Sequence, residues 1–116
     1  EAAPLACISI HQNSYTQEYV NGAQVFYYEE SQEGKRLAGL LQESLRKRLN
    51  PENHRAIKSN DSYYLLKKTT IPTVIVECGF LSNYNEATLL ADSEYQDKVA
   101  WAIHMGIMQY IRENEK

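Results

Sequence analysis

The sequence has few cysteines, and its charges are nearly balanced. Only Cys7 and Cys78 occur in 116 residues, which excludes a scaffold of several disulfide bridges and a zinc site made of four cysteines. Twelve Lys and Arg stand against fifteen Asp and Glu, a net charge of −3. This balance provides no broad basic surface, so nucleic acid is not an expected partner.

Long apolar runs are also missing. No run approaches the ~20 residues that a membrane-spanning helix needs, so no membrane span is expected. Residues 1–4 have neither the basic start nor the apolar stretch of a signal peptide. What is present is typical of a globular protein, with 43% apolar and 23% charged residues. We expect one domain, residues 1–116, around a single core.

Three segments are predicted as strands. Residues 5–10 (LACISI) form a short apolar run that ends in His11, which is typical of a strand buried on both faces. Residues 23–28 (AQVFYY) have the β-branched and aromatic content of a second strand. Residues 73–76 (TVIV) predict a central strand, again buried on both faces, that ends at residues 77–79.

Apolar spacing predicts a long helix in the first half of the chain. Ser31 is its expected cap, and Asn50-Pro51 stops it. Its apolar stripe recurs at steps of three and four and consists of Leu37, Leu40, Leu41, Leu45 and Leu49. The polar residues 50–62 then predict a surface loop, and residues 63–66 resume an extended pattern.

Two more helices are expected near the end of the chain. Asn83 with Glu86 has the form of a capping box for a short helix that reaches about residue 91, and Ser93 with Gln96 repeats it for a helix to about residue 112. The later helix carries an apolar stripe of Val99, Ala102, Ile103, Gly106, Ile107 and Tyr110. Strands separated by amphipathic helices predict an α/β three-layer sandwich, with a mixed, mostly parallel sheet and helices on its faces.

Two ionisable residues follow the predicted buried strands, at the ends where sites in such sheets gather. His11 comes directly after residues 5–10, and Glu77 directly after residues 73–76. A bare carboxylate beside an apolar strand costs several kcal/mol unless it is paired, hydrogen-bonded or near a metal. A neutral imidazole is the commonest metal ligand, and a nearby carboxylate can serve as base to a metal-bound water. The pair suggests metal-assisted hydrolysis, although a structural histidine also fits this position.

The cysteines offer a competing interpretation, in which Cys7, His11 and Cys78 bind zinc or Cys78 is a nucleophile with His11 as its base. In an extended strand Cys7 and His11 are about 13 Å apart, too far to share one ion. Cys78 alternates to the face opposite Glu77 if the strand continues. Buried, inert thiols are therefore expected for both cysteines.

The remaining histidines and two cations in the polar loop have weaker signals. His54 lies in that loop and His104 in the last helix, and solvated or packing roles are expected for both. Arg55 and Lys58 could meet a carboxylate of a ligand, although most such charges face water.

Taken together, several strings resemble one known family in their order and spacing. They are residues 8–13 (ISIHQN), residues 21–28 (NGAQVFYY), Arg55 with Lys58, residues 64–66 (YLL) and residues 72–83 (PTVIVECGFLSN). This pattern resembles the zinc-dependent N-acetylmuramoyl-L-alanine amidases of the amidase 3 family. Residues 26–28 (FYY) and 77–80 (ECGF) are most similar to the sporulation amidases that act on spore cortex.

The resemblance implies a peptidoglycan hydrolase that cleaves the amide between N-acetylmuramic acid and L-alanine of the stem peptide. It implies that His11 is a zinc ligand, that Glu77 is the catalytic carboxylate and that Asn13 lines the substrate cleft. It also implies zinc as the cofactor, peptidoglycan as the partner, and export to the cell wall or spore envelope.

The chain also departs from that family. Its members carry a glycine-rich histidine motif and a helical glutamate that supply two further zinc ligands, and neither appears here. We therefore expect a C-terminal portion of an amidase domain, inactive in isolation, whose sheet a missing N-terminal segment or a neighbouring chain completes. The alternative is a non-catalytic glycan- or peptide-binding module on the same scaffold, and a thiol hydrolase is a distant third.

Overall fold

The computed structural model describes residues 5–13, 22–60, 71–80 and 84–115. This part of the chain forms a four-stranded sheet in the order β1-β4-β2-β3, with three helices. The strands are β1 (Cys7–Asn13), β2 (Gln24–Tyr27), β3 (Lys58–Ser59) and β4 (Thr73–Phe80). The helices are α1 (Gln32–Leu49), α3 (Tyr84–Leu90) and α4 (Ser93–Asn114). None of the helices in these ranges is long and apolar enough to cross a bilayer.

The sheet is mixed, as predicted. β4 pairs in parallel with β1 and antiparallel with β2, and β2 pairs in parallel with β3. β4 is central because its β-branched run packs on both faces, and every side chain from Thr73 to Cys78 is at most 6% exposed. The strand continues to Phe80 rather than ending at residues 77–79, because its pairing with β1 extends past an irregularity beyond His11.

β1 differs from the prediction that it is buried on both faces. It lies at one end of the strand order, where β4 is its neighbour in the part of the chain that the structure describes. Ile10 is consequently 57% exposed, and Cys7 is only partly buried. A short apolar run cannot distinguish a central strand from an edge strand, since both positions accept the same residues.

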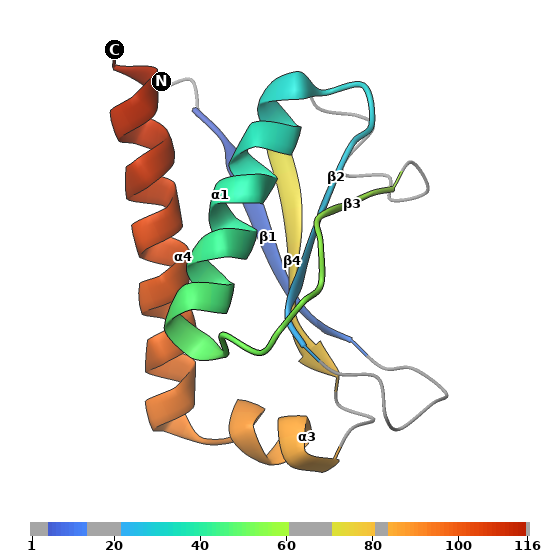
Figure 1. The fold of residues 1–116 in the computed structure, drawn as a ribbon, viewed down its shortest axis with the longest axis vertical. Helices are drawn as coiled ribbons and strands as arrows, with labels where there is room; N and C mark the ends of the chain where they lie inside the picture. The colour runs from blue at the N-terminus through green and yellow to red at the C-terminus, as the bar shows by residue number, and fades with distance from the viewer. Residues whose placement is uncertain (1–4, 14–21, 61–70, 81–83, 116) are drawn as a thin grey trace.

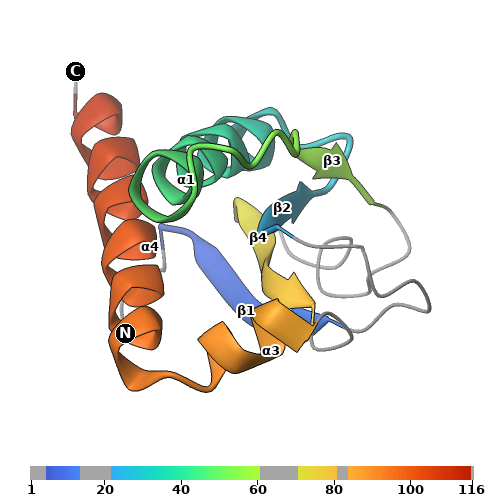
Figure 2. The same ribbon diagram turned by 60° about the horizontal axis from the view of Figure 1, so that its bottom comes forward.

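β3 lies inside the segment predicted to be a polar loop. It forms because the chain after α1 runs back along β2, where Phe26 pairs with Lys58 and Tyr27 with Ser59 (Figure 2). A strand of two residues has too few positions to show alternation, so the sequence contains no periodic signal for it. The predicted strand 23–28 is confirmed as β2.

The helices begin and end close to the predicted residues, with one corrected cap. Ser31 caps α1 as predicted, since its Oγ accepts a 2.9 Å hydrogen bond from the Gly34 N–H. Asp92, not Ser93, is the N-cap of α4, and its carbonyl accepts from the Gln96 N–H at 2.9 Å. The Gln96 side chain donates instead to the Leu90 carbonyl at 2.8 Å, so it joins α4 to α3. Asn83 and the extended segment 63–66 lie outside the described residues.

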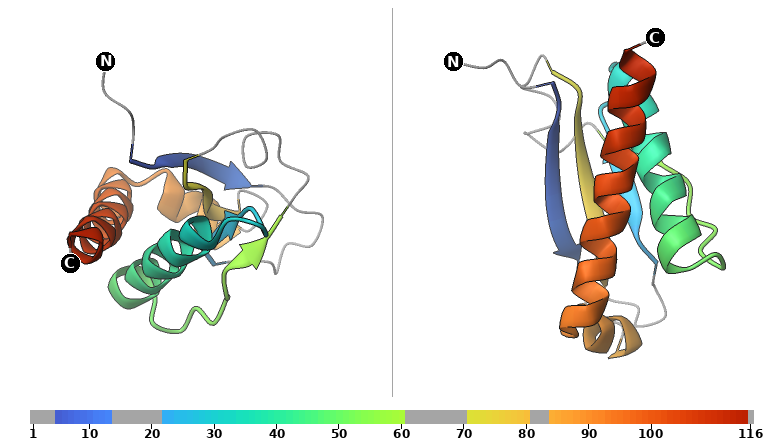
Figure 3. Two further views of the ribbon diagram at one scale, coloured as in Figure 1. Left: turned by 90° about the horizontal axis from the view of Figure 1, so that it is seen from above. Right: turned by 90° about the vertical axis from the view of Figure 1, so that its left-hand side faces the viewer.

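α1 and α4 lie side by side against one face of the sheet, and α3 lies at the carboxyl end of β4 (Figures 1 and 3). The predicted apolar stripes of both long helices face the core. The α/β architecture expected from the sequence is confirmed. The fully buried side chains of this core include Val25, Leu37, Ala38, Leu41, Val74, Val76 and Ala102.

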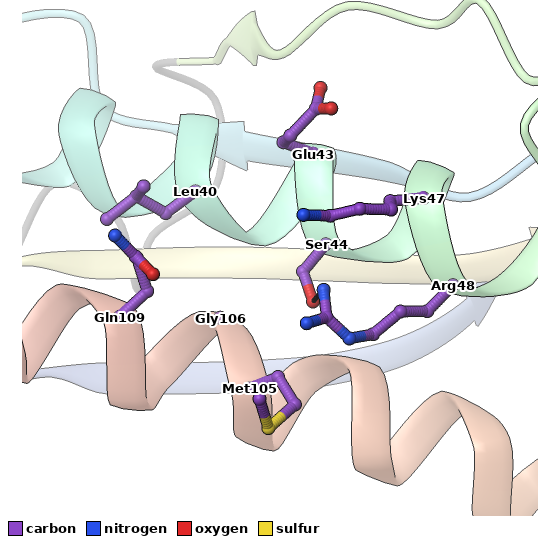
Figure 4. Close-up of a pocket in the computed structure, with 8 residues that line it drawn as sticks. All are labelled: Leu40, Glu43, Ser44, Lys47, Arg48, Met105, Gly106 and Gln109. Carbon is purple, nitrogen blue, oxygen red and sulfur yellow. Dashed lines mark hydrogen bonds between the residues drawn. The ribbon is translucent and has the colours of Figure 1, made fainter.

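The two long helices approach closely at Gly106. A methyl group at Gly106 would lie 2.7 Å from Leu41 Cδ2 and 3.2 Å from Leu41 Cα, so only glycine fits without a shift. Nearby, Ser44 Oγ donates a 2.6 Å hydrogen bond to the Ala102 carbonyl. A groove of about 260 Å³ runs along this contact, lined by side chains of both helices (Figure 4). It lies on the helical face of the sheet and is a seam of the helix packing.

Candidate active site

The parallel pairing of β1 with β4 brings His11 and Glu77 together. Their Cα atoms are partners in the register, so their side chains leave the sheet on the same face. His11 Nδ1 lies 4.0 Å from Glu77 Oε1. The sequence places both residues at strand ends, and the structure brings these ends together because parallel strands finish at the same edge.

The two side chains have different surroundings. The Glu77 side chain is 3% exposed, whereas that of His11 is 42% exposed. His11 Nε2 is 2.7 Å from Ser9 Oγ, two residues earlier on the same face of β1. The pair therefore combines a carboxylate enclosed by the protein with an imidazole that a ligand can reach from solvent.

Gln24 lies beside Glu77 on β2, so that His11, Glu77 and Gln24 form a row across three strands. The sequence alone does not predict this position of Gln24. It is the Cα partner of Glu77 on β2, so its side chain leaves the same face on the side away from His11. Gln24 Nε2 donates to the Ala56 carbonyl at 2.8 Å, and Gln24 Oε1 accepts from Arg55 Nη1. The register between β2 and β4 alone reveals this position, and one sequence carries no signal for it.

The start of β2 is fixed by two buried amides from other elements. Gln42 of α1 accepts from the Val25 N–H at 2.8 Å and donates to the Ala23 carbonyl at 3.1 Å. Asn53, in the segment after α1, donates to the same Ala23 carbonyl at 3.0 Å. These bonds satisfy β2 backbone groups before its pairing with β3 begins, and they hold Gln24 beside Glu77.

Glu86 of α3 contacts both Gly79 near the end of β4 and Gly22, two residues before β2. Gly22 has a φ of 99°, and its N–H donates a 2.7 Å hydrogen bond to Glu86 Oε2. A methyl group on Gly79 would lie 3.1 Å from Glu86 Oε1, so the carboxylate packs closely over the strand. The sequence suggests Glu86 only as part of a capping box, because its contact with Gly22 spans 64 positions.

The cysteines take no part in the row. Cys78 points to the face opposite Glu77 and is 6% exposed within the core. Burial, together with the charge of Glu77, raises the pKa of the Cys78 thiol to about 11, so it remains protonated at neutral pH. Cys7 is partly exposed on β1, which corrects the expectation of a buried thiol there, because an edge strand is covered less completely.

The other sequence candidates are distributed around the molecule. His54 is exposed in the segment after α1. His104 is exposed on α4 beside Trp101, with ring centroids 5.5 Å apart. Lys58 is exposed on β3. The backbone of Asn13 ends β1, but its side chain lies outside the described residues, so its place in a cleft stays a prediction.

The described residues do not by themselves make a catalytic zinc site. Such a site needs three protein ligands and an open position for water. Residues 5–13, 22–60, 71–80 and 84–115 contain no group of three or more His, Cys, Asp or Glu side chains able to hold a metal. In this part of the chain His11 and Glu77 supply one imidazole and one carboxylate.

Comparison with known proteins places the chain in a family. The family model described as N-acetylmuramoyl-L-alanine amidase matches residues 2–109. The germination-specific N-acetylmuramoyl-L-alanine amidase of Bacillus subtilis is 42% identical over 106 residues, which are 91% of this chain and 44% of that protein. A chain of this length therefore spans less than half of that relative.

Solved structures agree with this assignment. The CwlD amidase of Clostridioides difficile, in complex with the GerS lipoprotein, superimposes with a TM-score of 0.91 at 44% identity, over 93% of this chain and 55% of that one. The amidase AmiC2 of Nostoc punctiforme gives a TM-score of 0.85 at 31% identity, over 93% of this chain and 58% of that one. The chain belongs to the N-acetylmuramoyl-L-alanine amidase family.

Proposed function

We propose that the protein carrying this chain hydrolyses the amide bond between N-acetylmuramic acid and the L-alanine of a peptidoglycan stem peptide. Two findings support the proposal: the chain belongs to the amidase family, and His11 pairs with Glu77 in the sheet. The pairing is the observation that carries it, because a base must lie within reach of the group that binds the reacting atoms. The alternative of a non-catalytic binding module is not favoured, since the matched relatives are amidases.

In this proposal Glu77 moves the protons of the reaction. Its carboxylate takes a proton from the attacking water and gives it to the departing amine. The Glu77 side chain is 3% exposed, and the partly exposed imidazole of His11 lies on the neighbouring strand. This environment suits a carboxylate that binds one water molecule while the protein excludes others.

His11 is proposed as one ligand of a zinc ion. Bound zinc would lower the pKa of a water molecule and polarise the scissile carbonyl. The other ligands are proposed to come from outside the described residues. Asn13 is proposed to line the cleft beyond His11.

The relatives also suggest where the protein acts. One of them is germination-specific and others are described as probable cell wall amidases. We therefore propose a role on spore cortex or cell wall, which requires export of the protein from the cytoplasm.

The experiment is release of L-alanyl peptides from purified peptidoglycan by the full-length protein. We expect release that a chelator abolishes and added zinc restores, with Glu77→Gln as the inactive control. Activity that resists the chelator but is lost on treatment with iodoacetamide would contradict the proposal and favour a thiol hydrolase.

A further inference from the structure

The helical layer carries a groove between α1 and α4, on the face of the sheet opposite Glu77 (Figure 4). Its volume is about 260 Å³. Pockets that enclose a small molecule measure about 300 to 1,000 Å³. A smaller groove between two helices has room for side chains of a larger partner rather than for a whole small ligand.

One wall of the groove continues into an apolar stripe on the exposed side of α4. The stripe consists of Trp101, Met105 and Met108, which recur at steps of four and three and therefore lie on one side of the helix. Met105 lines the groove, while Trp101 and Met108 are 56% and 41% exposed. Trp and Met are enriched where proteins bind one another, and large apolar side chains exposed together mark such surfaces. The stripe is therefore suited to contact apolar side chains of a partner.

The other wall, which α1 provides, is basic. Lys47 and Arg48 line it, and Figure 4 shows both side chains extending back along α1 towards Ser44. Arg48 Nη1 donates a 3.2 Å hydrogen bond to Ser44 Oγ, which holds the guanidinium in the groove. Glu43 also lines the groove, but its carboxylate points away from α4 and is bonded to Arg46. This wall therefore presents positive charge to a partner.

The two walls together indicate the chemistry of the partner. The basic wall attracts carboxylates, and the apolar stripe attracts apolar side chains. An amphipathic helix carries both kinds of side chain on adjacent faces, and such helices bind in grooves through apolar residues at steps of three, four and seven. A phosphate polymer would match the charge but would leave the apolar stripe without a counterpart.

We propose that the groove between α1 and α4 docks an acidic amphipathic helix of a second protein. The apolar side chains of that helix contact Trp101 and Met108. Its carboxylates bind Lys47 and Arg48. The inference is independent of the proposed amidase function, because the groove and the candidate active site lie on opposite faces of the sheet.

The probe is a displayed library of helical peptides of about 18 residues, or five turns, selected against the full-length protein. Its apolar positions are constant and its polar positions vary among Glu, Gln and Lys. We expect enrichment of peptides with Glu beside the apolar face. Their dissociation constants, measured by fluorescence anisotropy, should rise roughly 10- to 100-fold in the double variant Lys47→Gln/Arg48→Gln and in Trp101→Ala.

Two matched variants serve as controls and should leave these constants unchanged. Lys35→Gln removes another exposed cation of α1, and Leu89→Ala removes an apolar side chain of α3 that is 42% exposed. Failure to enrich acidic peptides would overturn the proposal, and so would binding that the groove variants do not weaken.

Two further measurements separate the other occupants. A dimer of the full-length protein that dissociates in Trp101→Ala, observed by sedimentation, would assign the groove to a second copy of the protein instead. Tighter binding of poly(glycerol phosphate) than of the selected peptides would assign it to an anionic polymer. None of these measurements depends on turnover, so release of L-alanyl peptides from peptidoglycan tests the proposed amidase function separately.

Discussion

Glu77 and Cys78 are neighbours in β4, yet they have opposite chemical surroundings. Alternation along a strand sends Glu77 to the face of His11 and Gln24, and Cys78 into the core beneath the helices. Burial holds the thiol of Cys78 in its protonated form. At the scale of single residues, one peptide step therefore separates the candidate general base from an inert side chain.

The roles proposed for His11 and Glu77 predict different effects of their removal. In the full-length protein His11→Ala should lower the zinc content, because a ligand is lost. Glu77→Gln should keep the zinc content and lower kcat by roughly 10²- to 10⁴-fold, because a general base contributes about this much. Metal analysis and peptide release measure the two effects. Equal loss of zinc in both variants would show that Glu77 is a ligand rather than the base.

Among the elements, α1 joins the other long helix to the sheet. Its Leu41 meets Gly106 of α4, and its Gln42 bonds to the backbone at the start of β2. At its beginning, Arg36 lies 4.5 Å above the ring of Tyr110 and 3.1 Å from Glu113 Oε1, so the same helix also fastens the end of α4. Contacts on adjacent sides of one helix thus link the helical layer to the strand that carries Gln24.

Two glycines of the helices predict opposite responses to the same substitution. Gly106→Ala should lower the free energy of unfolding by about 1 to 3 kcal/mol, because the new methyl group overlaps Leu41. Gly39→Ala in α1 is the matched control, since nothing lies within 4 Å of its methyl group. It should raise stability by roughly 0.5 to 1 kcal/mol through helix propensity. Urea unfolding followed by circular dichroism measures both, and equal effects would contradict the close helix contact.

The molecule as a whole is a mixed sheet with its long helices on one face and the candidate site on the other. The core beneath α1 and α4 contains Val25, Val74 and Val76, while Glu77 and Gln24 point away from it. The helical layer consequently supplies stability and register, and the side chains with chemical function occupy the opposite face. This separation lets the site be probed without removing core side chains.

The buried thiol predicts how global stability depends on pH. The pKa of Cys78 is about 11 in the folded protein against an ordinary value of 9.0, so unfolding allows the thiol to ionise at a lower pH. This contribution is fully present below pH 9 and is lost as the pH rises towards 11. Between pH 8 and pH 10 the wild type should lose about 1 kcal/mol more stability than Cys78→Ala. Denaturant titrations of both proteins at the two pH values measure the difference, and parallel losses would contradict it.

Much of the fold is predictable from local patterns in the sequence. The stripe of leucines, the Ser31 cap and the β-branched run before Glu77 each depend on neighbouring residues, and the structure has α1 and β4 where these signals place them. The same local signals predict the position of β1 along the chain correctly, but they do not predict how exposed its side chains are. Exposure depends on which strands lie beside it, which is a property of the sheet.

The residues of the candidate site can also be separated into those that the sequence predicts and those that it does not. The order of residues is enough to predict that an imidazole and a carboxylate follow two apolar strands, because strand ends can be read from composition and turn residues. It takes the folded chain to show that they share a face at 4.0 Å, and that Gln24, which is bonded to Arg55, lies beside Glu77. The physical reason is that register and hydrogen bonds between remote segments depend on the whole packed chain, whereas strand ends depend only on adjacent residues.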